Sequence, residues 1–367
     1  MKIYCSYPRA QYLAHQADID KAIKRVLDSD RYILGEEVSA FECEFAEWLG
    51  IKHCVGVNSG TDALFLALRG LGVGLGDEVI APSYTAVPTI SSIGMTGAKP
   101  VLVDVNPLHY TIDPEKVEEA ITPHTSAIIA VHLFGQPADL EHLKSIALDH
   151  NLKLIEDCAQ AHGGKFNDAR LGTIGDVGCF SFFPTKNLGA LGDGGAIVTR
   201  DDKLAERIIK IRQYGWDDKR VSQEQGWNSR LDEIQAAVLR AKLPYLENDT
   251  ERRIALAARY DAGLASLPFK LPSRRKNSRH VFHLYVLQLE ERDALISHLS
   301  EHGIYAGTHY PVVAHQMPAY SGLEYGGEGL PVSDSLTEHV VSLPMYPELT
   351  DLEQGQIIST IREFYSK

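Results

Sequence analysis

The sequence predicts an α/β fold in which helices cover a mostly parallel sheet, followed by a smaller α+β domain. Between residues 54 and 199, short apolar runs alternate with segments long enough to hold crossover helices. Because a βαβα order places helices on both faces of a parallel sheet, this alternation predicts the larger domain. A strand pattern followed by helical patterns indicates a second unit beyond it. We therefore expect domains at 1–244 and 245–367.

The elements are predicted in chain order from apolar periodicity. Helices come first, from apolar stripes at Ile19, Ile23, Val26 and Leu27, and at Val38, Phe41, Phe45 and Trp48. Buried strands are then expected at 53–57, 78–82, 100–105, 127–133, 152–156, 178–183 and 195–199. No helix fits between the last two, so the sheet should become mixed there. Helical patterns over 231–264 break at Pro244, and a strand at 283–289, a helix at 292–301 and a helix after Thr350 complete the chain.

Composition excludes several classes of function. The 367 residues carry a formal net charge of -13, whereas nucleic-acid and anionic-membrane binders need surplus Lys and Arg. Five scattered cysteines, with no CxxC pair, suit a reducing compartment. The sequence has no signal-peptide pattern, no run of about 18 apolar residues and no HExxH metal motif. We expect a cytoplasmic protein that binds no nucleic acid, membrane or metal.

Three short motifs carry candidate chemistry. At 58–63, NSGTDA, a strand passes into a helix, whose N-terminus could hold a phosphate at Gly60 and Thr61 or simply be capped by a hydroxyl. Asp157 follows an apolar strand, where ligands bind in parallel sheets, and it could pair with a protonated ring nitrogen or be an ordinary loop residue.

The third motif centres on Lys186, which lies between apolar strand residues and a glycine-rich turn. A partly buried lysine can lose its proton and attack a carbonyl, although a lysine extending from a loop into solvent is the alternative. A phosphate cradle, a carboxylate for a pyridine nitrogen and an imine-forming lysine are together what pyridoxal 5'-phosphate (PLP) requires. PLP is therefore the predicted cofactor.

Longer motifs match those of a known family. They are NSGTDAL at 58–64, GDEVIAPSYT at 76–85, HLFGQPAD at 132–139, EDCAQAHG at 156–163, GDVGCFSFFPTKNLGALGDGGAIVT at 175–199, GWNSRLDEIQAAVL at 226–239 and HYP at 309–311. On these motifs, the chain from about residue 32 to its end resembles the DegT/DnrJ/EryC1/StrS family of nucleotide-sugar aminotransferases. That resemblance implies the fold-type I architecture of PLP enzymes, with a mostly parallel sheet of the seven-stranded type.

The resemblance also implies roles for single residues. Lys186 would bind the PLP aldehyde and shuttle a proton, Asp157 would pair with the pyridine nitrogen, and Gln160 would touch the 3-oxygen of the ring. Asn228 would reach into the site of a neighbouring subunit, which implies a homodimer. The phosphate would be held by the Thr61 and Ser181 hydroxyls and by the backbone of Gly60 and Asp62.

In one place the sequence departs from the family. Many relatives carry an aromatic residue after the threonine of the PSxT motif, where it stacks on the cofactor ring, but here this residue is Ala86. Tyr84 is the nearest replacement for a stacking face. Around the substrate, His162, His309 and Tyr310 are candidate contacts, with a structural role as the alternative for the histidines. The basic loop at 274–279 could meet a nucleotide diphosphate or be a solvated cluster.

The reaction implied by the resemblance moves an amino group from L-glutamate to a keto group of a nucleotide-linked deoxyhexose. The residues of the motifs most resemble relatives that aminate C3 of a dTDP-sugar, with amination at C4 or of a UDP-sugar as the alternative. A dinucleotide-dependent oxidoreductase would need a G-x-G-x-x-G motif, which neither glycine cluster provides. Some relatives that carry histidine in place of the lysine are dehydratases. The retained Lys186 favours transamination and disfavours a non-enzymatic regulator.

Overall fold

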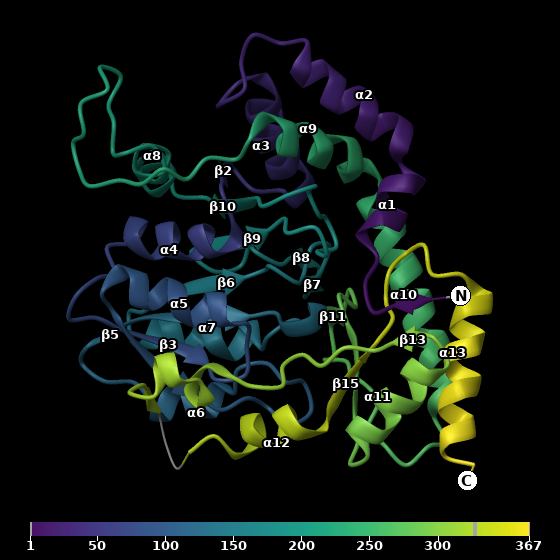
Figure 1. The fold of residues 1–367 in the computed structure, drawn as a ribbon. Helices are drawn as coiled ribbons and strands as arrows, with labels where there is room; N and C mark the ends of the chain where they lie inside the picture. Colours follow the sequence, from purple (N-terminus) through teal and green to yellow (C-terminus); the bar gives the residue numbers. More distant parts are fainter. Residues whose placement is uncertain (1, 326–328, 367) are drawn as a thin grey trace.

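A computed structural model of the chain describes residues 2–325 and 329–366. Within this described part, the largest sheet has eight strands in the order β14–β4–β3–β5–β6–β9–β10–β2 (Figure 1). Seven of them begin and end within two residues of the strands predicted above. These seven are β2 (His53–Val57), β3 (Glu78–Pro82), β4 (Lys99–Val103), β5 (Thr125–Val131), β6 (Lys153–Asp157), β9 (Val177–Ser181) and β10 (Gly195–Thr199). The eighth, β14 (Glu324–Tyr325), comes from the C-terminal third and was not predicted.

The directions of the strands bring several carboxyl ends to one edge of this sheet. Neighbours from β14 through β4, β3, β5 and β6 to β9 are parallel, whereas β10 is antiparallel to both β9 and β2. The prediction that the sheet becomes mixed after β9 is therefore confirmed. Since β2 and β9 both oppose β10, they run in the same direction, and the carboxyl ends of β2, β3, β6 and β9 share one edge.

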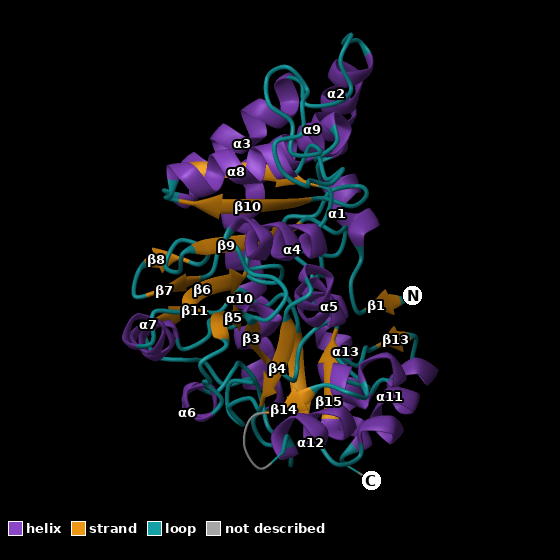
Figure 2. Cartoon of the chain, turned by 90° about the vertical axis from the view of Figure 1, so that its left-hand side faces the viewer, coloured by secondary structure: helices purple, strands orange, loops and turns teal. Residues whose placement is uncertain are grey.

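Helices cover both faces of the sheet, as Figure 2 shows. Alternate strand residues point to opposite faces, so Ile129 belongs to one hydrophobic cluster and Ile128 to another. On the first face lie α4 (Gly60–Gly70), α5 (Val87–Thr96) and α8 (Asp202–Ile211). The second face carries α3 (Glu36–Leu49), α6 (Pro114–Glu119), α7 (Leu140–Asp149) and α9 (Glu233–Lys242).

A third cluster joins Ile3 with apolar residues between 256 and 361. There β1 (Ile3–Tyr4) pairs with β13 (Ile304–Tyr305), and β12 (Tyr285–Gln288) pairs with β15 (Val340–Leu343). The remaining elements are α1 (Pro8–Ala14), α2 (Gln16–Leu27), α10 (Leu246–Leu264), α11 (Arg292–Glu301), α12 (Pro331–His339), α13 (Asp351–Phe364), β7 (Lys165–Phe166), β8 (Ala169–Arg170) and β11 (Ser278–Arg279), together with four short 3-10 turns. The division of the chain at residue 245 stays a prediction. Among the described residues, no helix is both long and apolar enough to pass through a lipid bilayer.

Candidate active site

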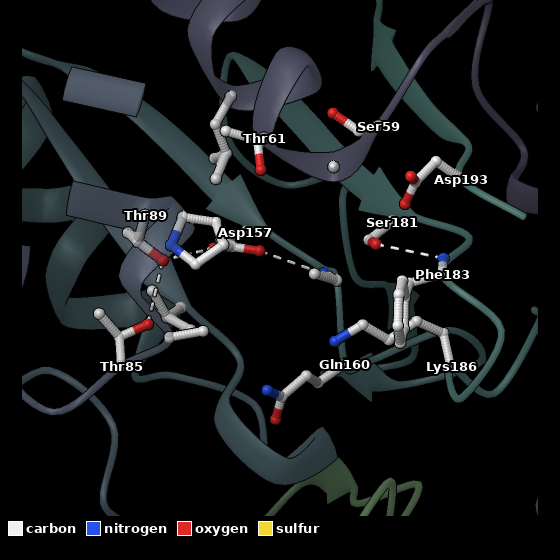
Figure 3. Close-up of a pocket in the computed structure, with 16 residues that line it drawn as sticks. Ser59, Thr61, Thr85, Thr89, Asp157, Gln160, Ser181, Phe183, Lys186 and Asp193 are labelled. Atoms are coloured by element: carbon white, nitrogen blue, oxygen red, sulfur yellow. Dashed lines mark hydrogen bonds between the residues drawn. The ribbon is translucent and has the colours of Figure 1, made fainter. Parts of the chain in front are cut away.

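A pocket lies at the sheet edge where the carboxyl ends of β2, β3, β6 and β9 meet, the place where ligands bind in open α/β sheets. Its empty volume is about 740 Å³ and is partly open to solvent. Asp157 enters at the end of β6, and Lys186 enters from the turn between β9 and β10 (Figure 3). The lining is formed by Ser59, Gly60, Thr61, Leu64, Thr85, Ala86, Pro88, Thr89, Val131, Asp157, Ala159, Gln160, Ser181, Phe183, Lys186 and Asp193.

One end of the pocket is the N-terminus of α4. Ser59 is the N-cap of this helix, and its Oγ accepts a hydrogen bond of 3.1 Å from the backbone N–H of Asp62. Gly60 and Thr61 line the pocket at the first helical turn, where N–H groups have no partner within the helix. Both alternatives weighed from the sequence therefore coexist: Ser59 caps the helix, and the two residues after it form a surface suited to an anion.

Gly60 also permits a close approach to β9. A Cβ atom at position 60 would lie 2.5 Å from the Cβ of Ser181, a distance at which two carbon atoms that are not bonded to each other clash. The missing side chain thus lets Ser181, at the end of β9, pack directly against the first turn of α4. A hydroxyl and a helix N-terminus converge there on one end of the pocket.

Burial changes the acid–base chemistry of Lys186. Its side chain is almost wholly enclosed, and this desolvation lowers the pKa of the amine to about 8, while the charge of Asp157 acts in the opposite direction. About a tenth of the Lys186 side chains are therefore unprotonated amines at pH 7, far more than for an ordinary lysine. Figure 3 shows the amine pointing into the space that Asp157 and Gln160 also face.

Asp157 is held in a fixed orientation. Its Oδ2 accepts a hydrogen bond of 2.9 Å from Thr89 Oγ1, and its Oδ1 accepts one of 3.1 Å from the N–H of Ala159. Thr89 in turn contacts Thr85. Burial raises the pKa of Asp157, whereas the Ala159 N–H, Thr89 and Lys186 lower it. A positively charged N–H group in the pocket would stabilise the ionised carboxylate further.

The predicted residues Gln160, Tyr310, His309 and Tyr84 form a connected set beside the pocket. Gln160 lines the pocket, and its Nε2 donates to the phenol oxygen of Tyr310 at 2.9 Å. Burial raises the pKa of Tyr310 to about 12, and the nearby charge of Asp157 acts in the same direction. Burial lowers the pKa of His309 to about 4, and the nearby charge of Lys186 also lowers it. Tyr84 is fully buried and does not line the pocket, whereas Ala86 does, so the structure gives no support to Tyr84 as a stacking face.

The other predicted residues lie outside the lining. His162 is packed in the core against Phe180 and Phe182, and burial lowers its pKa to about 3. Asn228 is exposed and lies next to Ser229, whose hydroxyl donates to the carboxylate of Asp62. Of the phosphate candidates, Asp62 therefore faces its N-cap and Ser229, and it does not line the pocket of its own chain.

Sequence reasoning did not assign several lining residues to the site, among them Thr85, Pro88, Thr89, Phe183 and Asp193. Thr85 and Thr89 follow the end of β3 and link to Asp157. Phe183 and Asp193 flank the turn that carries Lys186, and Pro88 lies in the first turn of α5. Thr85 lies in the matched PSYT stretch, so that motif was a usable signal. For Asp193, its neighbourhood with the predicted lysine in the glycine-rich turn was the available clue.

One cluster resembles a metal site by composition. His132, Glu156 and Cys158 are buried and bring potential ligand atoms within 4.8 Å of one another, which the sequence did not suggest. Glu156 is already saturated, however, because it contacts His132 Nε2 at 3.1 Å and accepts hydrogen bonds from the N–H groups of residues 172, 174 and 175. Burial acts to raise the pKa of Glu156, but these partners hold it below its usual value. We interpret the cluster as a structural network.

The basic loop at 274–279 has intramolecular partners. Arg274 pairs with Asp261, Arg275 with Asp139 at 2.7 Å, and Arg279 with two glutamates of α10, Glu247 and Glu251. The arginines of this loop thus fasten neighbouring segments together.

Comparisons with known proteins agree with the geometry. Residues 14–362 match the model of the DegT/DnrJ/EryC1/StrS aminotransferase family. A dTDP-3-amino-3,4,6-trideoxy-alpha-D-glucose transaminase of Streptomyces venezuelae is 48% identical over 97% of this chain and 94% of its own length. A dTDP-3-amino-3,6-dideoxy-alpha-D-galactopyranose transaminase of Aneurinibacillus thermoaerophilus is 46% identical over 96% of each chain.

Solved structures extend this likeness to the fold. The crystal structure of Streptomyces venezuelae DesV in complex with a ketimine intermediate has a TM-score of 0.97 and 47% identity, over 100% of this chain and 99% of that one. The structure of ntda from Bacillus subtilis with bound cofactor PMP has a TM-score of 0.89 and 31% identity, over 96% and 82% of the two chains. The fold class and enzyme class predicted from the motifs are confirmed. The chain belongs to the DegT/DnrJ/EryC1/StrS aminotransferase family.

Proposed function

We propose that this protein is a PLP-dependent aminotransferase that moves an amino group from L-glutamate to the C3 keto group of a dTDP-linked 6-deoxyhexose. The observation that carries the proposal is that Lys186, Asp157 and the N-terminus of α4 line one pocket. The choice of C3 and of dTDP is supported by two relatives, 48% and 46% identical, that are named for dTDP-3-amino sugars.

The residues present fit PLP on grounds independent of the relatives. The turn at Gly60 and Thr61, with the Ser181 hydroxyl beside it, is suited to bind an anion. All three residues line the pocket, and only a glycine fits at position 60. Asp157 is a buried carboxylate, and desolvation raises its pKa. An aromatic ring nitrogen that carries a proton would supply a positive partner for it.

The pocket residues would then have distinct tasks. When bound, PLP takes up the amino group and stabilises negative charge on the neighbouring carbon. Lys186 Nζ, unprotonated in part near neutral pH, would bind the aldehyde and later carry a proton to and from the reacting carbon. Asp157, oriented by Thr89 and Ala159, would keep a proton on the ring nitrogen.

A homodimer with shared active sites is part of the proposal. The segment between α8 and α9 projects from the body (Figure 1). Asn228 pairs with Gln213 in this segment, is exposed, and does not line the pocket of its own chain. Phe183 and Leu191, near that pocket, are apolar and 48% and 43% exposed, as expected for side chains that a second subunit covers.

All five cysteines are free thiols, which suits a reducing cytoplasm.

The test is to incubate the purified protein and PLP with L-glutamate and a panel of 3-keto and 4-keto dTDP- and UDP-sugars, followed by mass spectrometry. We expect one dTDP-3-keto sugar to exchange its carbonyl oxygen for an amine, and Lys186→Ala to abolish the exchange and the visible absorbance. Lys203→Ala, on the exposed surface of α8, is the matched control and should change neither. Amination of a 4-keto or UDP-sugar alone would move the assignment to the alternative, and a protein that takes up no PLP would refute it.

A further inference from the structure

Tyr84 makes two hydrogen bonds to a segment 225 residues further along the chain. Its hydroxyl donates to the backbone carbonyl of His309 at 2.7 Å and accepts from the backbone N–H of Tyr310 at 2.7 Å. The side chain is fully buried, so water cannot replace either bond. A single hydroxyl thus satisfies the donor and the acceptor of consecutive backbone groups.

The loop that holds Tyr84 also forms the wall of the pocket. Thr85 and Ala86, the next two residues, line the pocket, and Thr85 links through Thr89 to Asp157. The segment held by Tyr84 is therefore fixed relative to the wall that carries the acid–base groups.

Gln160 holds the same segment from a second direction. Its Oε1 accepts the backbone N–H of Phe134 at 2.7 Å, which fixes the amide so that Nε2 faces and donates to the phenol oxygen of Tyr310 at 2.9 Å. His309 is held at its ring, where Nδ1 contacts Ser342 Oγ at 2.8 Å. The backbone and side chains of His309 and Tyr310 are thereby held from three segments, which carry Tyr84, Gln160 and Ser342.

We propose that Tyr84 is a positioning residue, a clamp that sets the placement of His309 and Tyr310 beside the pocket, where Tyr310 contacts the lining residue Gln160. The inference rests on the proposed function and on the prediction from the sequence that these two residues contact the substrate. It replaces the stacking role predicted for Tyr84, because that ring is enclosed in the protein while its hydroxyl is fully used. Removal of the hydroxyl would leave a buried carbonyl and a buried N–H without partners and loosen the segment.

Tyr84→Phe separates the two roles, because it keeps the ring and removes only the clamp. In the full chain, we expect the peptide that covers residues 306–312 to exchange its amide hydrogens about tenfold faster, as measured by mass spectrometry. We expect the KM for the keto sugar nucleotide to rise about tenfold, equivalent to about 1.4 kcal/mol, with kcat changed less than about twofold. The Kd for PLP and its absorbance spectrum should stay as in the wild type.

The matched control is Tyr260→Phe, because the Tyr260 hydroxyl is also buried and donates to a backbone carbonyl, that of Pro344, at 2.9 Å. Tyr260→Phe should lower the thermal stability about as much as Tyr84→Phe does, because each variant loses one buried hydroxyl. It should leave the KM and the amide exchange of residues 306–312 unchanged. Weaker PLP binding in Tyr84→Phe, or unchanged exchange and KM, would overturn the clamp. The exchange measurement needs no substrate, so it still decides the question if the wild type aminates no sugar and the proposed function fails.

Discussion

Replacement of Asp157 by Asn should make Lys186 an even weaker base. In the wild type, burial lowers the pKa of Lys186 to about 8, and the Asp157 carboxylate opposes this decrease by favouring the ammonium. Compared with an ordinary lysine near 10.5, the decrease corresponds to about 3 kcal/mol against the charged form and about 300 times more free amine at neutral pH. Removal of the opposite charge while burial remains must lower the pKa further.

Reductive methylation of the apoenzyme at a series of pH values measures this directly, with the peptide that contains Lys186 quantified by mass spectrometry. The labelling rate should reach half its maximum near pH 8 in the wild type and at lower pH in Asp157→Asn. Lys242 is an internal reference: burial also lowers its pKa to about 8, but its charged neighbours are Glu348 and Asp249. Its profile should not move. A midpoint near 10 in the wild type, or a higher midpoint in the variant, would refute the reasoning.

Three further outcomes are expected. Mixed subunits of Lys186→Ala and Asn228→Ala should regain about a quarter of wild-type activity, since half of the dimers would be mixed and each would hold one intact site; mixtures as inactive as their parents would contradict a shared site. Gly60→Ala should weaken PLP binding at least about tenfold in a fluorescence titration, because the new Cβ would lie 2.5 Å from that of Ser181; an unchanged Kd would show that the turn does not hold the phosphate. The pKa of His162 is about 3 in the folded state, so its protonation on unfolding reduces stability as pH falls from about 6.5 toward 3, and His162→Phe should flatten the dependence of urea midpoints on pH in that window; an unaltered slope would count against it.

The regular elements could be predicted from the sequence because their signals are local. The strands at 53–57, 78–82 and 195–199 and the helix at 292–301 have the predicted bounds, since each apolar run stops at turn or capping residues. Lys186 and Asp157 could be placed in one site for a related reason. Parallel strands bring their carboxyl ends to a common edge, so residues that follow them are neighbours in space.

Contacts between distant segments could not be predicted in this way. Nothing near Tyr84 in the sequence indicates that its hydroxyl binds the backbone at 309–310, and the family pattern directed attention to the ring. The basic loop shows the same limit, because a run of arginines looks free until Asp139, on another segment, is found beside Arg275. The short strand β14 joins the edge of the large sheet beside β4, a pairing that two residues cannot specify by themselves.

Burial decides the chemistry of this pocket as much as residue identity does. A lysine and an aspartate on a solvated surface would be an ammonium and a carboxylate at neutral pH, and their attraction would only strengthen both charges. In the pocket, desolvation raises the pKa of Asp157 and lowers that of Lys186, so each group is closer to neutrality than it would be in water. A cofactor that brought a positively charged N–H to Asp157 and an aldehyde to Lys186 would stabilise both groups in the forms that the reaction needs. The two side chains are therefore prepared for a ligand by their own desolvation, and that desolvation depends on how the segments at this sheet edge pack around them.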